Sequence, residues 1–429
     1  MKKLILIAIL ISSFEFSSFA EDTAGKQLFS FAQDLHGFAD MRYGIRTQSD
    51  PNKEQTTLKE LRLQLSRIWY QDLFTLTARS DFVFDGVPNN HGRIDLETGE
   101  GPIDLRELNV LFTPVRWADV KVGRQILTWG TGDLLFINDL FSKDWKSFFA
   151  GRDEEYLKAP SDALFMSFFP SFANIDVAYM PRFDSDRFVD GERLSYWGGT
   201  GLTGTDLQTD KPDDWFTDDE IAVRISRYMK GWNVAAYGYS GYWKTPQGFD
   251  TFSGNNTFPK LSVYGASARG ALAGGIASFE AGYYDSREDR DGTDPWVPNR
   301  QFRLLAGYEH EIVKNLTGSA QYYVEHMMNH NEYLATFPGA PGTQADENRH
   351  VVTLRLTQML MNQNLTLGLF TYWSPSDQDG YLRPSAAYKL TDNWLIETRG
   401  NIFFGKNNDS FFGQFANNNN VAMAVRYSF

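Results

Sequence analysis

The chain has 429 residues, no cysteine and a formal net charge of −13 at pH 7. The lack of cysteine excludes disulfide frameworks, thiolate metal sites and cysteine nucleophiles, and the negative charge argues against nucleic acid as a partner. Aromatic residues reach 15% although the mean hydropathy is only −0.40. This combination is typical of strands with one apolar and one polar face, because the two faces cancel in an average.

The first twenty residues have the composition of an export signal. Lys2 and Lys3 precede an apolar run at residues 4–11, and Ser18 and Ala20 are small residues at the positions that a signal peptidase reads. A membrane-anchoring helix, the alternative, needs roughly 20 apolar residues, and this run is much shorter. We therefore predict a signal peptide at residues 1–20, cleaved after Ala20, and a single mature domain at residues 21–429.

After the signal, alternating apolar and polar residues bounded by turn residues predict eighteen β-strands. In residues 58–70, one face of the strand carries Leu61, Leu63 and Leu65, and the other carries Glu60, Arg62, Gln64 and Ser66. The same alternation recurs in residues 74–84, 351–356, 365–369 and 396–402. The predicted fold class is therefore all-β.

The connections between these strands alternate in length. Eight short links are expected near residues 70–72, 113–115, 170–172, 230–231, 273–274, 314–315, 362–363 and 391–393. Nine longer polar links are expected near residues 47–56, 87–102, 131–160, 183–216, 245–257, 287–299, 330–347, 375–379 and 406–417. A soluble propeller or sandwich, the alternative, shows no such short–long rhythm.

This layout predicts a transmembrane antiparallel β-barrel of the outer-membrane type, with about 18 strands and 16 as the alternative count. Short turns would lie at the periplasmic end and long loops outside, in the outer membrane of a Gram-negative bacterium. Barrels of 16 to 18 strands leave an aqueous channel, whereas about 22 strands enclose a separate plug. The chain has no residues to spare for a plug domain, so a channel is expected.

The last strand ends the chain on an aromatic residue. Its apolar face comprises Val421, Met423, Val425, Tyr427 and Phe429. This ending resembles the C-terminal signature of outer-membrane barrels, and the resemblance implies recognition of Phe429 by the barrel-assembly machinery, with outer-membrane lipid and lipopolysaccharide as surroundings. The alternative is an interfacial aromatic residue of the girdle.

The alternation also predicts which charged residues face the lumen. This inward set comprises Asp40, Arg42, Glu60, Arg62, Arg79, Asp81, Arg224, Arg303, Glu309, Glu325, Arg355, Arg383, Glu397, Arg399 and Arg426. Arginines outnumber acids, and a guanidinium holds carboxylate or phosphate through two hydrogen bonds. We predict that Arg62, Arg79, Asp81, Arg224, Arg303, Arg355, Arg399 and Arg426 line a pore for anionic solutes. The alternative is that each arginine pairs with a neighbouring acid.

The connection at residues 131–160 is too apolar for a freely solvated loop, because nine large apolar side chains fall between residues 134 and 149. We expect it to fold inward as a constriction that presents Lys143, Lys146, Arg152, Asp153 and Glu154 to the channel. The alternatives are a cap over the outer mouth or a contact between protomers.

Before this connection stand Gly123, Arg124 and Gln125, followed by Trp129 and Gly130. Gly123 interrupts an alternating strand and predicts a bulge. The stretch resembles the Gly-Arg-Gln and Trp-Gly pattern of the alginate-export-like group of outer-membrane barrels. That resemblance implies a channel, lined in the alginate exporters by basic residues for a polyuronate. The long apolar connection departs from it.

No residue pattern predicts an enzyme, a metal site or a cofactor. His326 and His330 would lie roughly 13 Å apart on one strand, too far to share an ion. The expected function is a channel or porin for small, anionic solutes. An exporter of an anionic polysaccharide, a sleeve around a partner protein and an adhesin remain the alternatives, and a homo-oligomer fits the trimers common among porins.

Overall fold

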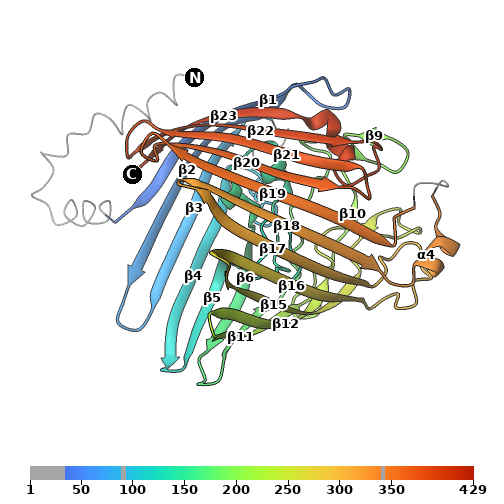
Figure 1. Cartoon of the computed structure of the whole chain (residues 1–429), viewed down its shortest axis with the longest axis horizontal. Coiled ribbons are helices and arrows are strands. Elements are labelled where there is room, and N and C mark those ends of the chain that lie inside the picture. Colours follow the sequence, from blue (N-terminus) through green and yellow to red (C-terminus); the bar gives the residue numbers. More distant parts are fainter. Residues whose placement is uncertain (1–33, 88–92, 340–343) are drawn as a thin grey trace, which may run out of the picture.

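The computed structural model describes residues 34–87, 93–339 and 344–429 of the chain. The predicted signal peptide and its cleavage point after Ala20 lie outside the described residues. Within them, the chain is mostly β-strand and connecting loop (Figure 1).

Eighteen antiparallel strands form one sheet that closes on itself. Each strand pairs with the next along the ring, and β23 pairs with β1, so the red and blue ends of the chain lie side by side in Figure 1. The strands are β1 (His36–Arg46), β2 (Thr56–Tyr70), β3 (Thr75–Asp85), β4 (Ile103–Val115), β5 (Ala118–Ile126), β6 (Pro160–Phe168), β7 (Asn174–Met180), β11 (Glu220–Met229), β12 (Trp232–Tyr242), β15 (Lys260–Leu272), β16 (Gly275–Ser286), β17 (Gln301–Val313), β18 (Leu316–Met327), β19 (Asn348–Leu360), β20 (Leu365–Ser374), β21 (Asp379–Lys389), β22 (Trp394–Gly405) and β23 (Asn420–Ser428). The predicted fold class and strand number are confirmed.

Alternation along each strand separates the two surfaces of the barrel. In β1, Asp40 and Arg42 are buried inside, whereas Met41 and Tyr43 between them are exposed on the outer face. The register continues this division around the ring, because Asp40 pairs with Arg426 of β23 and Met41 pairs with Val425. The sequence pattern therefore produces an apolar outer surface and a charged interior.

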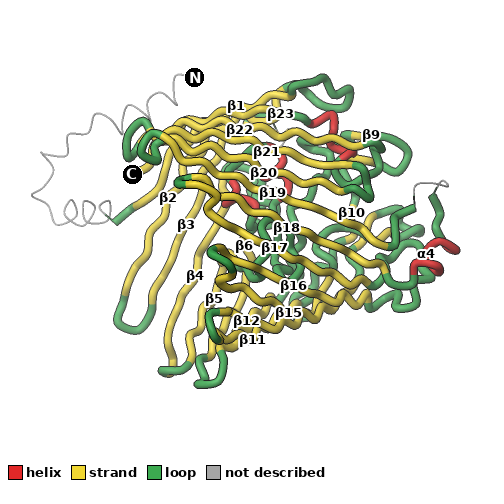
Figure 2. Tube along the Cα trace, viewed as in Figure 1, coloured by secondary structure: helices red, strands yellow, loops and turns green. Residues whose placement is uncertain are grey.

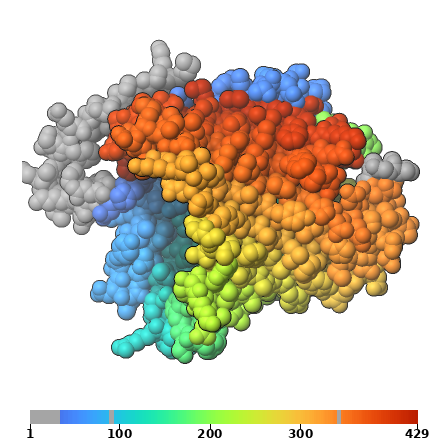
Figure 3. All heavy atoms as spheres, viewed as in Figure 1, coloured from blue at the N-terminus to red at the C-terminus, as the bar shows by residue number. Residues whose placement is uncertain are grey.

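The connections follow the predicted short–long rhythm. The eight short ones and the two described chain ends lie at one end of the barrel, and the nine long ones lie at the other (Figure 2). Figure 3 shows a recess at the short-connection end, between the blue and the yellow-green parts of the molecule. The barrel thus has one end with little covering structure and one end covered by long loops.

The long loops contain the remaining elements. Two small sheets are formed by β8 (Tyr196–Trp197) with β9 (Leu202–Thr203), and by β10 (Thr209–Asp210), β13 (Gly248–Phe249) and β14 (Asn256–Thr257). The helices are α3 (Trp145–Ala150), η1 (Glu154–Leu157), α4 (His330–Thr336) and η2 (Gly413–Asn418). Among the described residues, no helix is long and apolar enough to cross a membrane.

The main cluster of buried apolar side chains lies inside the barrel. Ile137, Phe141, Phe148 and Phe149 from the connection between β5 and β6 pack in it with inward side chains of the wall, including Tyr381. This connection, residues 127–159, is therefore enclosed by the strands, and we call it the internal loop.

Candidate functional site: the internal loop and the charged wall

The start of the internal loop is fixed to β16 by one carboxylate. Glu280 accepts hydrogen bonds from the backbone N–H groups of Thr131 and Gly132, the latter at 2.7 Å, and from Nδ2 of Asn138 at 2.9 Å. Gly130 has a φ of +82°, and a Cβ there would lie 3.1 Å from Glu280 Oε1. A glycine is therefore required where the loop turns onto this wall.

The middle of the internal loop is held by aromatic packing. Asp144 caps helix α3 by accepting a hydrogen bond of 2.7 Å from Ser147 N, and Gly151 ends the helix with a φ of +97°. The helix then presents Phe148 and Phe149 to the wall, where the Phe149 ring lies 5.7 Å from that of Tyr381 and 5.2 Å from that of Phe403. These contacts bury apolar side chains that a freely solvated loop would expose to water.

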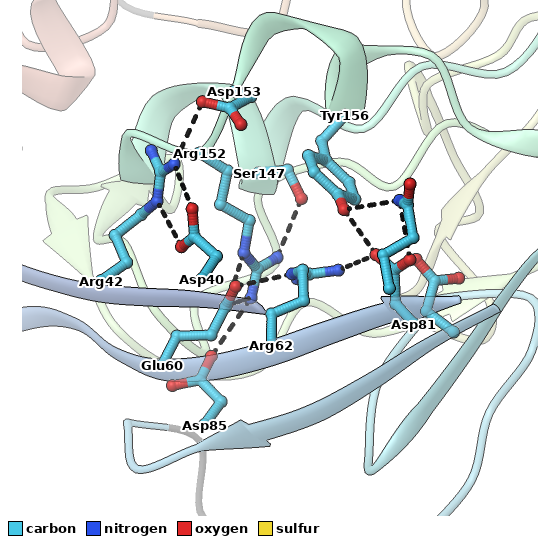
Figure 4. A network of polar contacts seen from close by, with 12 residues as sticks. Asp40, Arg42, Glu60, Arg62, Asp81, Asp85, Ser147, Arg152, Asp153 and Tyr156 are labelled. Carbon is cyan, nitrogen blue, oxygen red and sulfur yellow. Dashed lines mark hydrogen bonds and ion pairs between the residues drawn. The ribbon is translucent and has the colours of Figure 1, made fainter. Parts of the chain in front are cut away.

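The end of the internal loop is held by Tyr156. Its hydroxyl donates a hydrogen bond of 2.5 Å to Asp81, and the guanidinium carbons of Arg62 and Arg106 lie 4.4 and 4.9 Å from its ring centroid. Figure 4 shows this tyrosine above β2 and β3, beside the wall residues that it contacts. Tyr156 therefore joins the loop to the wall opposite Glu280.

The two attachment walls lie across the barrel from each other. β16 carries Glu280, and β2 carries Glu60, which accepts a hydrogen bond of 2.8 Å from Nε of Arg152. Following the ring from β2 to β16 takes nine steps, half of its eighteen strands. The internal loop therefore spans the lumen from wall to wall.

All seven arginines predicted to line the pore form ion pairs. Arg62 pairs with Glu60 and Asp81, Arg79 with Glu107, Arg224 with Asp176, Arg303 with Glu325, Arg355 with Asp133 and Glu154, Arg399 with Glu397 and Asp153, and Arg426 with Asp40 and Asp153. Asp81 itself is fully buried against Arg62 and Tyr156. The arginines are thus balanced by carboxylates, either on the wall or on the internal loop.

The five residues predicted to face the channel from the loop differ in their environment. Lys143 is only 3% exposed and pairs with Asp139 at 3.0 Å, so the prediction that its charge faces the channel is corrected. Lys146 pairs with Glu100 and Asp190, and although burial lowers its pKa, these two acids raise it above the ordinary value. The apolar surroundings of helix α3 explain why both lysines turn towards acids within the protein.

The other three of the five lie beyond the helix. Arg152 pairs with Glu60 and Asp85 (Figure 4), and Asp153 with Arg42, Arg399 and Arg426. Glu154 pairs with Arg355 and Arg383 and keeps 42% of its side chain exposed. The structure therefore brings Asp153 and Glu154 together with arginines of the wall.

The motif residues before the loop support its first turn. Gly123 has a φ of +118°, but neither strand pairing of β5 has a register shift at this residue, so the predicted bulge is wrong. Gln125 is buried and donates a hydrogen bond of 3.0 Å to Ala163 O, while Arg124 pairs with Asp162. Trp129 packs edge-on against Phe141 at 4.9 Å. These contacts join β5 to β6, the two strands that the internal loop connects, and pack the start of the loop beside them.

Several residues of this site were missing from the sequence prediction. Glu280 lies on the same face of β16 as Ser278 and Gly282, and Arg106 lies on the same face of β4 as Asp104. The alternation could therefore have predicted an inward orientation for both. Tyr156 lies on a connection, where alternation gives no orientation.

A cavity lined in part by charged side chains lies on the long-loop side of the internal loop. It measures about 110 Å³ and is lined by residues that include Arg62, Asp85, Lys146, Arg152, Glu192 and Arg193. Among the described residues, no group of three or more histidine, cysteine or acidic side chains is arranged to hold a metal ion.

Comparison with known proteins gives structural similarity only. No protein-family model and no curated protein matches the chain. The structure of OccAB1 from Acinetobacter baumannii is similar with a TM-score of 0.51 and 10% identity, over 92% of this chain and 96% of that one. Wzi of Escherichia coli, an outer-membrane protein, is similar with a TM-score of 0.50 and 9% identity, over 95% of this chain and 87% of that one. The resemblance to the alginate-export-like group stays a prediction, and the fold is that of an outer-membrane β-barrel.

Proposed function

We propose that the protein is a channel of the bacterial outer membrane for small solutes, and that the internal loop forms its constriction. The observation that carries the proposal is a closed ring of eighteen strands whose lumen is crossed by one 127–159 connection. A ring of this size is wide enough for an aqueous passage, and inward loops narrow such passages without closing the barrel wall.

We propose small anions as the solute class. Arginines of five wall strands converge on the internal loop, and a guanidinium recognises carboxylate through two parallel hydrogen bonds. The paired carboxylates weaken this positive field, so we expect a modest preference for anions over cations.

The export of a polysaccharide is less favoured. Wzi is described as a carbohydrate-binding barrel involved in capsule assembly, but the internal loop here joins opposite walls at β2 and β16. A polymer chain would have to displace this whole segment, including its buried aromatic side chains.

Deletion of residues 134–156 tests the proposal. Single-channel recording in a planar bilayer should show small open steps for the full protein and steps several times larger for the deletion variant, because the constriction is lost. Deletion of residues 250–254, a turn that contains the 99% exposed Phe252, is the control and should leave conductance unchanged.

Equal conductance of the two deletion variants and the full protein would contradict the constriction. No conductance in any of the three, in protein shown to be folded by heat-modifiable migration, would contradict the channel and favour the sleeve or adhesin. A reversal potential in a salt gradient reports the ion preference, and a cation preference would contradict the solute class.

A further inference from the structure

Five arginines form a basic patch on one side of the inner wall. Arg42 projects from β1, Arg355 from β19, Arg383 from β21, Arg399 from β22 and Arg426 from β23. Four of these strands, β21, β22, β23 and β1, are consecutive in the ring. We call this group the arginine patch.

Residues 151–154 of the internal loop fill the arginine patch with oxygen acceptors. Gly151 O accepts a hydrogen bond of 2.8 Å from Arg42, and Arg152 O accepts bonds of 2.7 and 2.9 Å from Arg399 and Arg383. Main-chain oxygens therefore occupy three of the five guanidinium groups.

Carboxylates of the same segment accept further hydrogen bonds from the arginine patch. Asp153 accepts a hydrogen bond of 3.0 Å from Arg42 (Figure 4). It also pairs with Arg426. Glu154 accepts one of 3.0 Å from Arg355 and one of 3.3 Å from Arg383. A small multivalent anion would present the same kind of acceptors to the same donors.

The carboxylates of the wall do not by themselves balance the positive charge of the arginine patch. On the wall, Asp40 and Glu397 pair with members of the patch, which leaves three of its five positive charges. Asp133, Asp153 and Glu154 of the internal loop compensate these three. Withdrawal of the Asp153 and Glu154 side chains would therefore leave two of these three positive charges uncompensated, while Asp133 stays paired with Arg355.

The segment is attached by polar contacts alone, between two apolar anchors. Phe148 and Phe149 are buried before it and Tyr156 is buried after it, whereas residues 151–155 contribute no large apolar side chain. The Glu155 side chain forms no hydrogen bond or ion pair with any described residue, and its own desolvation, followed by the nearby Asp153, raises its pKa. The side chains of Asp153 and Glu154 can therefore leave the arginine patch without unpacking the aromatic cluster, while Arg152 keeps its bond to Glu60.

We propose that the arginine patch is a binding site for small multivalent carboxylates, and that the side chains of Asp153 and Glu154 are an internal competitor that such a solute displaces. The proposal rests on the proposed channel function, which it deepens by naming the site and the solute chemistry. It is consistent with both predictions for the lumen arginines, pairing with acids and binding of anions. The same guanidinium groups would pair with acids when no solute is bound and with the solute during its passage.

Calorimetric titration of the detergent-folded full chain with succinate tests the site. Asp153→Asn combined with Glu154→Gln removes the competing charges and keeps the shapes of both side chains, so succinate affinity should rise about tenfold over the unaltered protein. The matched control is Glu325→Gln, which frees Arg303 on a different part of the wall and should leave the affinity unchanged.

A further substitution locates the binding. Adding Arg399→Gln to the double variant should abolish the gain in affinity. Equal affinity of the double variant, the Glu325→Gln control and the unaltered protein would overturn the proposal, as would a gain that survives Arg399→Gln. If the double variant does not fold, Glu154→Gln alone, which alters the more exposed carboxylate, should give a gain of a few-fold, and no gain would overturn the proposal.

Bilayer recording of the same proteins separates the two proposals. Conductance without any change in succinate affinity would retain the channel and refute the site. Tighter succinate binding in protein that never conducts would retain the arginine patch as a site and refute the channel.

Discussion

Tyr156 is a residue through which the internal loop contacts the charged wall of β2, β3 and β4. Its hydroxyl donates a hydrogen bond to Asp81, and its ring lies against Arg62 and Arg106. A single side chain thus satisfies a buried carboxylate and packs against two cations. Its loss should release the end of the loop while the aromatic cluster still holds the middle.

Tyr156→Phe tests this attachment. The substitution removes the 2.5 Å hydrogen bond to buried Asp81 and keeps the ring, so it should weaken the attachment by about 1–3 kcal/mol. In bilayer recordings we expect frequent transitions between two conductance levels that the unaltered channel lacks. Tyr333→Phe, in helix α4 outside the internal loop, is the control, and identical recordings for the two variants would contradict the role of Tyr156.

Asp184 is a second residue with a testable property. It follows β7 on the long-loop side, its Oδ2 atom is buried without a hydrogen-bond partner, and its backbone N–H donates to Glu220. Burial, and then the Glu220 carboxylate, raise its pKa to about 6, although Lys244 and Lys211 oppose this. Between the ordinary pKa of an aspartate and pH 6, the Asp184 carboxyl therefore binds more protons in the folded protein than in the unfolded chain.

The sign of this shift predicts that the connection at residues 181–219 is most stable below pH 4 and loses that stability as the pH rises through 6. Hydrogen exchange, corrected for intrinsic rates, should show protection of this connection falling about tenfold between pH 5 and pH 8. Asp184→Asn, which mimics the protonated form, should remove the dependence, and Asp206→Asn in the same connection should keep it. A dependence that persists in Asp184→Asn would contradict the assignment.

At the scale of elements, helix α3 is short but strongly anchored. Six residues make a marginal helix in water, so its stability comes from the Asp144 cap and from the packing of Phe148 and Phe149 on the wall. Helix α3 therefore fixes the middle of the internal loop to the wall.

Phe149→Ala tests how much the packing of this ring stabilises the internal loop. The ring contacts Tyr381, Phe403 and Phe415, and its removal should cost about 3–5 kcal/mol. We expect proteases added to the folded barrel to cut the internal loop faster, with conductance rising. Phe252→Ala, which removes an exposed ring, should change neither, and an uncut loop in Phe149→Ala would show that other contacts suffice.

The strands could be predicted from the sequence, and the partners of the lumen side chains could not. Period-two alternation gives the face on which Arg355 lies, and the structure agrees. Its partner Asp133 is 222 positions away on a connection, and no local pattern relates the two. The same limit explains Lys143, whose burial depends on how helix α3 packs and not on its neighbours in the chain.

At the scale of the whole molecule, Phe429 takes part in the strand pairing that closes the barrel. Phe429 exchanges two backbone hydrogen bonds of 3.0 Å with Gly37, and its ring remains 41% exposed on the outer face. We propose that assembly machinery recognises this residue, so Phe429→Ala should lower the amount of heat-modifiable barrel in outer membranes several-fold. Met423→Ala, on the same face of β23, is the control; equal loss in both variants would point to lipid contact instead.

The pairing of β1 with β23 also bears on biogenesis. Strand β1 finds one of its two neighbours only when β23 is present, so a partly synthesised or truncated polypeptide exposes two unpaired sheet edges. Such edges are templates for pairing with another chain, so the seam is the place at which an unfinished barrel is open to aggregation.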